Sequence, residues 1–280
     1  MTIKHLLPLS FRDYLRPAYQ RACGYGRTFR ETLVTSPSWP KPRAWHELRS
    51  SLKSITDLGE LYRIANREFG VFQIEEEIVP FLEYVRSCQP RTIGEIGILF
   101  GGNTFLFQQT LTEMKRQLAI DIKLHNVAKA RFLARRGQRL HMLEGSSYSP
   151  NMINSVQSWL GADRFDFLFI DGDHEYEGVR ADFLAYYDLV RPGGLIAFHD
   201  IVPDEFARTG QRTSGSQCYG GGVYRLWQEL RDRFPHREFV QSWDQNGFGI
   251  GVITKPDNGR LPDDLNEKLQ VADRNHPMSH

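Results

Sequence analysis

The chain is 280 residues long and 40% hydrophobic, which is enough for one large domain with a sizeable core. Its 35 basic and 34 acidic residues leave a formal net charge of +1, which argues against a dedicated nucleic-acid-binding surface and favours small molecules or proteins as partners. No apolar run approaches the roughly 20 residues of a membrane span, so we expect no transmembrane segment.

The cysteines indicate a reducing compartment. Cys23, Cys88 and Cys218 are odd in number and share no metal-ligand spacing, which favours neither a disulfide framework nor a zinc cluster. The first residues lack the long apolar core of a signal peptide, so we expect a soluble, cytoplasmic protein. Because the first 35 residues mix basic and apolar side chains, weak attachment to a membrane surface stays open.

Residues 1–72 are expected to form an N-terminal appendage that is partly helical and partly irregular. The stretch "SPSWPKPRAW" carries three closely spaced prolines, which enforce an extended connection. The appendage could be a dimerisation arm, a substrate lid or a docking segment, so a homo-oligomer is one of the expected outcomes. The main domain is expected to begin at residue 73, because apolar residues then recur at helical spacing: Ile74, Ile78, Phe81, Leu82 and Val85.

From there, strand-like and helical segments alternate, which predicts an α/β fold with right-handed βαβ units. The helix before the fifth strand should present one apolar face made of Val179, Phe183, Tyr186, Tyr187 and Val190. A β-hairpin around "DQNG" should complete the sheet, and residues 256–280 should form a polar tail. The predicted parallel strands are "PRTIGEIG", "QLAID", "RLHMLEG", "FDFLFID" and "GGLIAFHD", and the hairpin strands are "EFVQSW" and "FGIGVITK".

The first motif is "EIGILFGGNT", which starts at Glu95. Gly97, Gly101 and Gly102 would let the backbone approach a nucleotide-like ligand closely before a helix begins. Three residues separate Gly97 from Gly101, which differs from the dinucleotide pattern and disfavours NAD. An ordinary structural turn is the alternative.

Two further polar groups follow neighbouring strands. Asp121 ends the second strand, where an acidic side chain can accept hydrogen bonds from both ribose hydroxyls. The small turn "EGSS", with Ser146, follows the third strand at the same edge and could border an adenine ring. Solvated turn residues would explain both features without a ligand.

The stretch "FDFLFIDGDHEYEGVRADF" places acidic groups and a histidine behind a strand of buried aromatics. Asp171 and His174 are expected at the carboxyl end of this strand, where open α/β sheets keep their ligands. Asp173 is of the type that caps the following helix. Asp182 is expected on that helix's surface or at a helix-to-loop contact.

Taken in order, these motifs and "RPGGLIAFHDI" resemble the class I S-adenosylmethionine-dependent methyltransferases. The E-I-G-x-x-x-G-G-x-T and I-D-G-D-H patterns are similar to the branch of small-molecule O-methyltransferases and cephalosporin-hydroxylase-like proteins. The resemblance covers residues 73–254. It implies a Rossmann-like, mostly parallel seven-stranded sheet with a terminal hairpin, which favours methyl transfer over hydride transfer.

The resemblance also implies a cofactor site. Glu95 would meet the ammonium of S-adenosylmethionine, Asp121 would hold the ribose, and Ser146 would lie beside the adenine. The three glycines would let the backbone pass close to the cofactor, and Asp171 would also contribute to this site.

The resemblance further implies a metal held by Asp171, His199 and Asp200, with Mg²⁺ or Mn²⁺ as the expected ion. The ion would bind a substrate hydroxyl, and His174 or Asp171 would remove its proton. This chain departs from metal-binding relatives, which often have two acidic or amide residues where it has His199 and Asp200. His199 could bind Mn²⁺ or another transition ion, act as a base in a metal-free site, or hydrogen-bond Asp171.

The expected function is therefore O-methylation of a hydroxyl on a small metabolite, such as a sugar or a natural product. Tyr219 and Tyr224 could line the acceptor pocket, whereas Trp227 is expected in the core. Two alternatives stay open. The same fold and cofactor site could serve non-methylating, hydroxylase-like chemistry, or the protein could be a non-catalytic scaffold.

Overall fold

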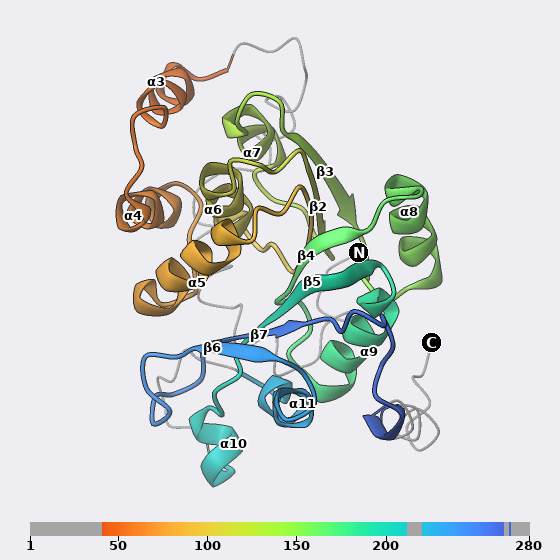
Figure 1. Cartoon of the computed structure of the whole chain (residues 1–280). Coiled ribbons are helices and arrows are strands. Elements are labelled where there is room, and N and C mark those ends of the chain that lie inside the picture. Colours follow the sequence, from red (N-terminus) through yellow and green to blue (C-terminus); the bar gives the residue numbers. More distant parts are fainter. Residues whose placement is uncertain (1–40, 212–219, 266–268, 270–280) are drawn as a thin grey trace, which may run out of the picture.

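The computed structural model describes residues 41–211, 220–265 and 269, and they build a seven-stranded sheet between two helical layers (Figure 1). The strand order is β3-β2-β1-β4-β5-β7-β6. The first five strands run parallel, and β7 is antiparallel to both β5 and β6. The predicted Rossmann-like sheet with a terminal hairpin is therefore confirmed. The strands are β1 (Thr92–Ile96), β2 (Arg116–Asp121), β3 (Arg139–Glu144), β4 (Phe165–Ile170), β5 (Val190–His199), β6 (His236–Phe239) and β7 (Ile250–Thr254).

The helices cover the two faces of this sheet because strand side chains alternate between faces. One core cluster joins Ile93, Phe167 and Phe169 of the strands to α4 (Leu58–Glu68), α5 (Glu75–Ser87), α6 (Gly102–Thr110) and α7 (Val127–Leu133). The other joins Ile96, Leu168 and Ile170 to α8 (Pro150–Leu160), α9 (Tyr176–Tyr187) and α11 (Val223–Arg231). The strands are consequently buried on both sides, as parallel strands usually are.

The segment before residue 73 includes α3 (Arg43–Ser51) and α4. Leu58, Leu61 and Ile64 of α4 are buried and share a core cluster with the sheet, whereas α3 has no buried residue. The segment after α4 lies directly against the start of α6. A Cβ atom added at Gly102 would lie only 2.2 Å from the carbonyl oxygen of Gly70. The predicted domain boundary at residue 72 stays a prediction, and residues 1–40 of the expected appendage lie outside the described residues.

Two element boundaries differ from the sequence prediction. Val190 was expected on the helix face before the fifth strand, but α9 ends at Tyr187 and Val190 is the first residue of β5, paired with Phe165. The first hairpin strand was expected to reach residue 243, but β6 ends at Phe239. The prediction for Val190 was wrong because an apolar residue three positions after the last residue of a helical stripe is compatible with both a helix and a buried strand.

The predicted core position of Trp227 is confirmed. Its side chain is 1% exposed on α11, and its indole Nε1 donates a hydrogen bond to Glu238 at 2.8 Å. A Cβ on Gly251 would lie 2.6 Å from the Trp227 ring, so β7 runs directly beneath the indole. This contact ties α11 to the antiparallel end of the sheet.

The carboxyl ends of the parallel strands meet at one edge of the sheet. His199, the last residue of β5, pairs with Ile250, which also pairs with Phe239 at the end of β6. The loop 240–249 and the short helix α10 (Glu205–Thr209) after β5 therefore belong to the same edge. Within the described ranges, none of the helices has the length and apolar character needed to cross a membrane.

Candidate functional site

The glycine turn after β1 has a left-handed backbone at Gly97, Leu99 and Gly101, with φ values of 81°, 46° and 91°. A Cβ on Gly97 would lie 2.0 Å from the carbonyl oxygen of Asp171, which no side chain could tolerate. Gly97 is thus required for close packing within the protein, whether or not a ligand binds. Around Gly101 the nearest atom to such a Cβ is 3.6 Å away, so this part of the turn stays open.

Asp121 shapes this turn from the end of β2. Its Oδ2 accepts hydrogen bonds from the amides of Ile98 and Leu99 at 2.9 and 2.8 Å, and its Oδ1 accepts one from Lys123 at 3.0 Å. Burial raises the pKa of Asp121, although these backbone hydrogen bonds oppose the shift. An ionised carboxylate has about four acceptor sites, so the half-buried Asp121 keeps acceptor capacity for a ligand such as a ribose.

Glu95 lies beneath α6, because it shares a strand face with Ile93. It is 1% exposed, and its Oε2 accepts hydrogen bonds from Thr104 Oγ1 at 2.7 Å and Gln117 Nε2 at 3.2 Å. Burial raises the pKa of Glu95 to about 8. Its Oε1 has no hydrogen-bond partner among the described residues, which leaves a buried acceptor of the kind an ammonium group would satisfy.

Ser146 is half-buried in the turn after β3, at the same edge of the sheet. Its carbonyl oxygen accepts a hydrogen bond from Ser149 Oγ at 2.9 Å, at the start of α8. Next to it, the hydroxyl of Tyr148 donates to Asp173 Oδ2 at 3.3 Å. The turns after β3 and β4 are therefore joined by side chains, which places Ser146 near the polar end of β4.

The ends of β4 and β5 bring together Asp171, His174, His199 and Asp200, which we call the histidine–carboxylate cluster. Asp171 Oδ1 lies 3.2 Å from His199 Nδ1 and 3.5 Å from His174 Nε2. Asp200 Oδ2 lies 3.2 Å from His174 Nδ1 and 3.4 Å from His199 Nδ1. All four predicted residues thus lie in one group, in which each carboxylate faces both imidazoles.

The charges of this cluster determine its protonation. Burial alone would raise the pKa of Asp171, but the charges of His199 and His174 and their hydrogen bonds lower it to about 2. Burial alone would lower the pKa of His199, but Asp200 and Asp171 outweigh it and raise that pKa well above its ordinary value. Without another cation, His199 is therefore an imidazolium between two carboxylates.

Three residues of the cluster could hold a metal ion, and the predicted set of Asp171, His199 and Asp200 stays a prediction. One ligand atom each from Asp171, His174 and Asp200 lies within 4.8 Å of the others, so His174 joins the two carboxylates. One imidazole with two carboxylates suits Mn²⁺ or another transition ion better than the all-oxygen site that Mg²⁺ prefers. His199 Nε2 is buried and has no hydrogen-bond partner among the described residues, so its Nδ1 makes the observed contacts.

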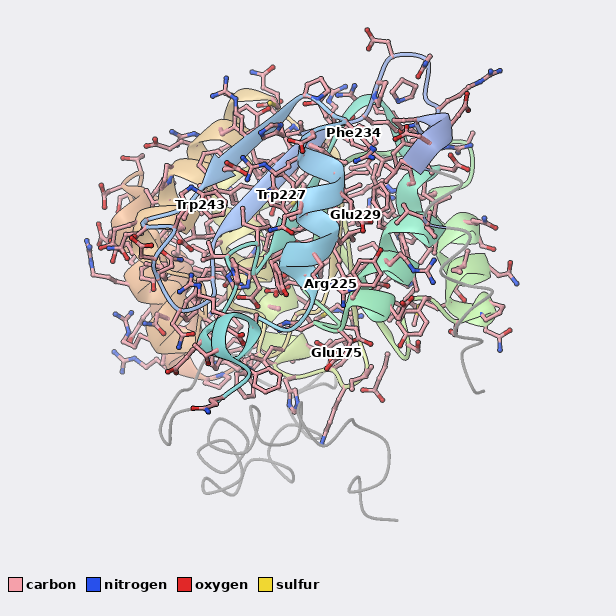
Figure 2. All side chains as sticks on the ribbon, turned by 90° about the horizontal axis from the view of Figure 1, so that it is seen from below. Glu175, Arg225, Trp227, Glu229, Phe234 and Trp243 are labelled. Atoms are coloured by element: carbon pink, nitrogen blue, oxygen red, sulfur yellow. The ribbon has the colours of Figure 1, made fainter. Side chains whose placement is uncertain are left out.

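The start of α11 packs against the loop that carries His174. A Cβ on Gly221 would lie 2.1 Å from the carbonyl oxygen of His174, and the Gly222 amide donates to that oxygen at 2.7 Å. Figure 2 views this side with α11 in front, Arg225 near its beginning and Glu229 on its flank. Tyr224 on this helix is half-buried, whereas Tyr219 lies outside the described residues.

Two buried polar residues at this edge were missed by the sequence analysis. Gln73 Nε2 donates to Asp171 Oδ2 at 2.7 Å, and Glu77 accepts hydrogen bonds from the loop 240–249. The only sequence signal was that Glu77 lies beside the apolar stripe of its helix, four residues before Phe81. Gln73 gave no signal, because its partner is 98 residues away.

Part of the chain, including this edge, is similar to known proteins. Residues 95–201 match a family described as a methyltransferase domain. Over 100 residues, the chain is 27% identical to mycinamicin VI 2''-O-methyltransferase of Micromonospora griseorubida, covering 36% of this chain and 24% of that protein. It is also 57% identical over 35 residues to uncharacterized protein R132 of Acanthamoeba polyphaga mimivirus, covering 12% of this chain and 16% of that protein.

Solved structures show a likeness at lower identity. An O-methyltransferase from Bacillus cereus in complex with SAH gives a TM-score of 0.48 at 18% identity, covering 76% of this chain and 97% of that one. A putative O-methyltransferase from Klebsiella pneumoniae gives 0.47 at 19% identity, covering 78% and 91%. These likenesses carry no weight for the activity.

Proposed function

We propose that the protein transfers a methyl group from S-adenosylmethionine to a hydroxyl oxygen of a small metabolite, because residues 95–201 match a family described as a methyltransferase domain. The observation that carries this proposal is the contact between Gly97 and Asp171. It joins the cofactor-type turn directly to the histidine–carboxylate cluster, so a cofactor and an acceptor could meet there. The mycinamicin relative supports an acceptor such as a sugar or a natural product.

In this proposal, the cofactor occupies the edge between β1, β2 and β4. Asp121 accepts from the ribose hydroxyls with its remaining acceptor sites, and Ser146 borders the adenine. Gly101 leaves space for the ligand to approach the main chain, whereas Gly102 lets the turn pack against Gly70. The carboxylate of Asp171 supplies negative charge for the ammonium, and the unpartnered Oε1 of Glu95 supplies a buried acceptor that becomes charged once the ammonium lies beside it.

The proposed proton transfer uses the cluster. His174 or Asp171 takes the hydroxyl proton as general base. For His174, the hydroxyl would replace one of the two carboxylate contacts of the ring nitrogens, and the remaining carboxylate would stabilise the resulting imidazolium. A divalent ion held by Asp171, His174 and Asp200, or by the carboxylates with His199, would instead lower the hydroxyl's pKa as a Lewis acid. In either arrangement, the cluster orients the oxygen toward the methyl donor.

A second candidate function is favoured by the two imidazoles. Two histidines and two carboxylates can hold a redox-active transition ion, which would serve hydroxylase-like chemistry at the same edge. A scaffold role would need neither the ion nor the cofactor. The first experiment therefore tests cofactor binding before any acceptor is known.

That experiment is calorimetric titration of S-adenosylmethionine into chelator-treated protein, repeated with Mg²⁺, with Mn²⁺ and with NAD in place of the cofactor. We expect saturable binding of S-adenosylmethionine and none of NAD. Asp121→Ala should weaken cofactor binding, because it removes both the ribose acceptor and the support of Ile98 and Leu99. Release of S-adenosylhomocysteine with hydroxylated acceptors would then demonstrate methyl transfer, whereas no binding of S-adenosylmethionine under any condition would contradict the proposal.

A further inference from the structure

The start of α5 brings two buried polar residues to the histidine–carboxylate cluster. Gln73 precedes the helix and is 4% exposed, and Glu77 lies in its first turn and is fully buried. Burying an amide and a carboxylate in an apolar layer is costly unless each finds hydrogen-bond partners. Gln73 finds its partner at the end of β4, and Glu77 finds its partners in the loop 240–249 between β6 and β7.

Gln73 acts on Asp171 directly. Its Nε2 donates to Asp171 Oδ2 at 2.7 Å, while Asp171 Oδ1 faces His199 and His174. The amide therefore distinguishes the two carboxylate oxygens, holding one and leaving the other for the imidazoles. Rotation of the Asp171 carboxylate would break the hydrogen bond with Gln73.

Glu77 acts on Asp200 through the loop 240–249. Its Oε1 accepts from the Gln241 amide at 3.1 Å and from Gln245 Nε2 at 2.6 Å, and its Oε2 accepts from the Gly249 amide at 2.8 Å. In this loop the Phe248 amide donates to Asp200 Oδ1 at 3.0 Å. Asp200 is thus held in the same way as Asp171, with one oxygen fixed by hydrogen bonding and the other facing the imidazoles.

We infer that Gln73 and Glu77 are positioning residues that fix the orientation of the Asp171 and Asp200 carboxylates, so that one oxygen of each faces the histidines. This inference rests on the proposed function, in which those oxygens bind an ion or stabilise an imidazolium. Hydrogen-bond partners of metal-binding or catalytic carboxylates typically contribute about 10–100-fold to affinity or activity when removed. We expect a loss of that size although neither residue contacts the proposed substrate.

Gln73→Leu is the main test, with Gln109→Leu as the matched control. Gln109 is 5% exposed and donates its Nε2 to the Leu133 carbonyl at 2.9 Å, so its loss also removes a buried amide hydrogen bond, but away from the cluster. Both variants should lose similar thermal stability. Only Gln73→Leu should lower kcat and Mn²⁺ affinity by about 10–100-fold, with the S-adenosylmethionine Kd changing less than threefold.

The ring ¹⁵N signals of His174 and His199, recorded in metal-free protein, test the inference without relying on turnover. Gln73→Leu should shift both signals, and Gln109→Leu should shift neither. Gln73→Glu keeps the side-chain shape but replaces the donor by an acceptor, so it should resemble Gln73→Leu. If Gln73→Glu behaves as wild type, Gln73 serves packing alone and the inference is wrong.

Glu77→Gln tests the role of Glu77. It keeps the side-chain size but places an NH₂ group against the hydrogen-bond donors of the loop 240–249. We expect it to shift the His174 signal through Asp200; an unchanged signal in a folded variant would overturn the role of Glu77. Wild-type protein that binds no S-adenosylmethionine would refute the proposed function. The ring signals would still decide the roles of Gln73 and Glu77.

Discussion

The glycine turn and the histidine–carboxylate cluster lie at the same edge of the sheet but are held in different ways. In the turn, Asp121 accepts from three backbone amides, and Gly97 lies against the main chain of Asp171. In the cluster, the carboxylates of Asp171 and Asp200 face the imidazoles of His174 and His199. The turn is therefore held mainly by backbone contacts, whereas the cluster is held mainly by contacts between side chains, apart from the hydrogen bond that Asp200 accepts from the Phe248 amide.

This difference separates two kinds of experimental effect. Substitutions in the turn should change stability and cofactor binding together, because the same atoms serve both. Substitutions in the cluster should change chemistry with a smaller effect on folding. Burying a group of charges rarely adds much net stability, since desolvation offsets their attraction.

The largest expected effect is that of His174→Gln in the cluster. Removing a general base lowers kcat by about 10²–10⁴-fold. The S-adenosylmethionine Kd should stay within threefold, because the His174 ring contacts the carboxylates of Asp171 and Asp200 and the proposal assigns it no contact with the cofactor. Single-turnover methyl transfer and calorimetry measure the two quantities.

The Mn²⁺ affinity of the same variant distinguishes the two roles open to His174. If His174 is a metal ligand, the variant should lose much of the Mn²⁺ affinity. If His174 is a base that does not bind the metal, the variant should retain that affinity. His141→Gln is the control, because His141 lies in β3 against Trp159 and should change neither quantity. A His174→Gln variant with wild-type kcat would exclude both roles.

Local sequence signals were sufficient to predict the sheet. Apolar runs that end in polar residues are such signals, and the carboxyl ends of parallel strands meet at one edge, so the sequence places Asp121 and Asp171 at that edge. The inclusion of His199 and Asp200 in the cluster came from the family resemblance. The hydrogen bonds of Gln73 and Glu77 could not be predicted, because their partners depend on how α5 packs over the sheet. The same limit applies to Asp182, which was expected on a helix surface or at a helix-to-loop contact and is completely buried.

The second prediction concerns the turn and compares Gly97→Ala with Gly101→Ala. Both glycines have positive φ, and a left-handed backbone costs an alanine roughly 1–2 kcal/mol. Only at Gly97 would the added methyl group also meet a main-chain atom, at 2.0 Å. Gly97→Ala should therefore lower the Tm by several degrees more than Gly101→Ala and should weaken cofactor binding as well.

Gly101→Ala serves as the matched control, since its nearest neighbour would be 3.6 Å away. Thermal unfolding followed by circular dichroism gives both Tm values. Equal losses in the two variants would mean that the contact between Gly97 and Asp171 contributes nothing to stability. Substitutions in the glycine turn could then change cofactor binding without changing stability, which would contradict the expected coupling of the two.

The smallest expected effect belongs to Asp182, a buried carboxyl on α9 that lies outside both regions. Neither of its oxygens has a hydrogen-bond partner among the described residues, and burial raises its pKa from 3.8 to about 7. Between pH 3.8 and about pH 7, Asp182 in the folded protein therefore retains a proton that it has lost in the unfolded chain. The carboxyl therefore destabilises the fold increasingly as pH rises from about 4 to 7, and by a constant amount above pH 7.

Asp182→Asn removes this titration, so the Tm of the variant relative to wild type should be higher at pH 8 than at pH 5. Asp188→Asn, at the exposed end of the same helix, is the control and should follow wild type at both pH values. Differential scanning calorimetry at the two pH values measures the change. A pH-independent difference between Asp182→Asn and wild type would show that Asp182 is ionised in the folded protein. It would then need a cationic partner that the described residues do not provide.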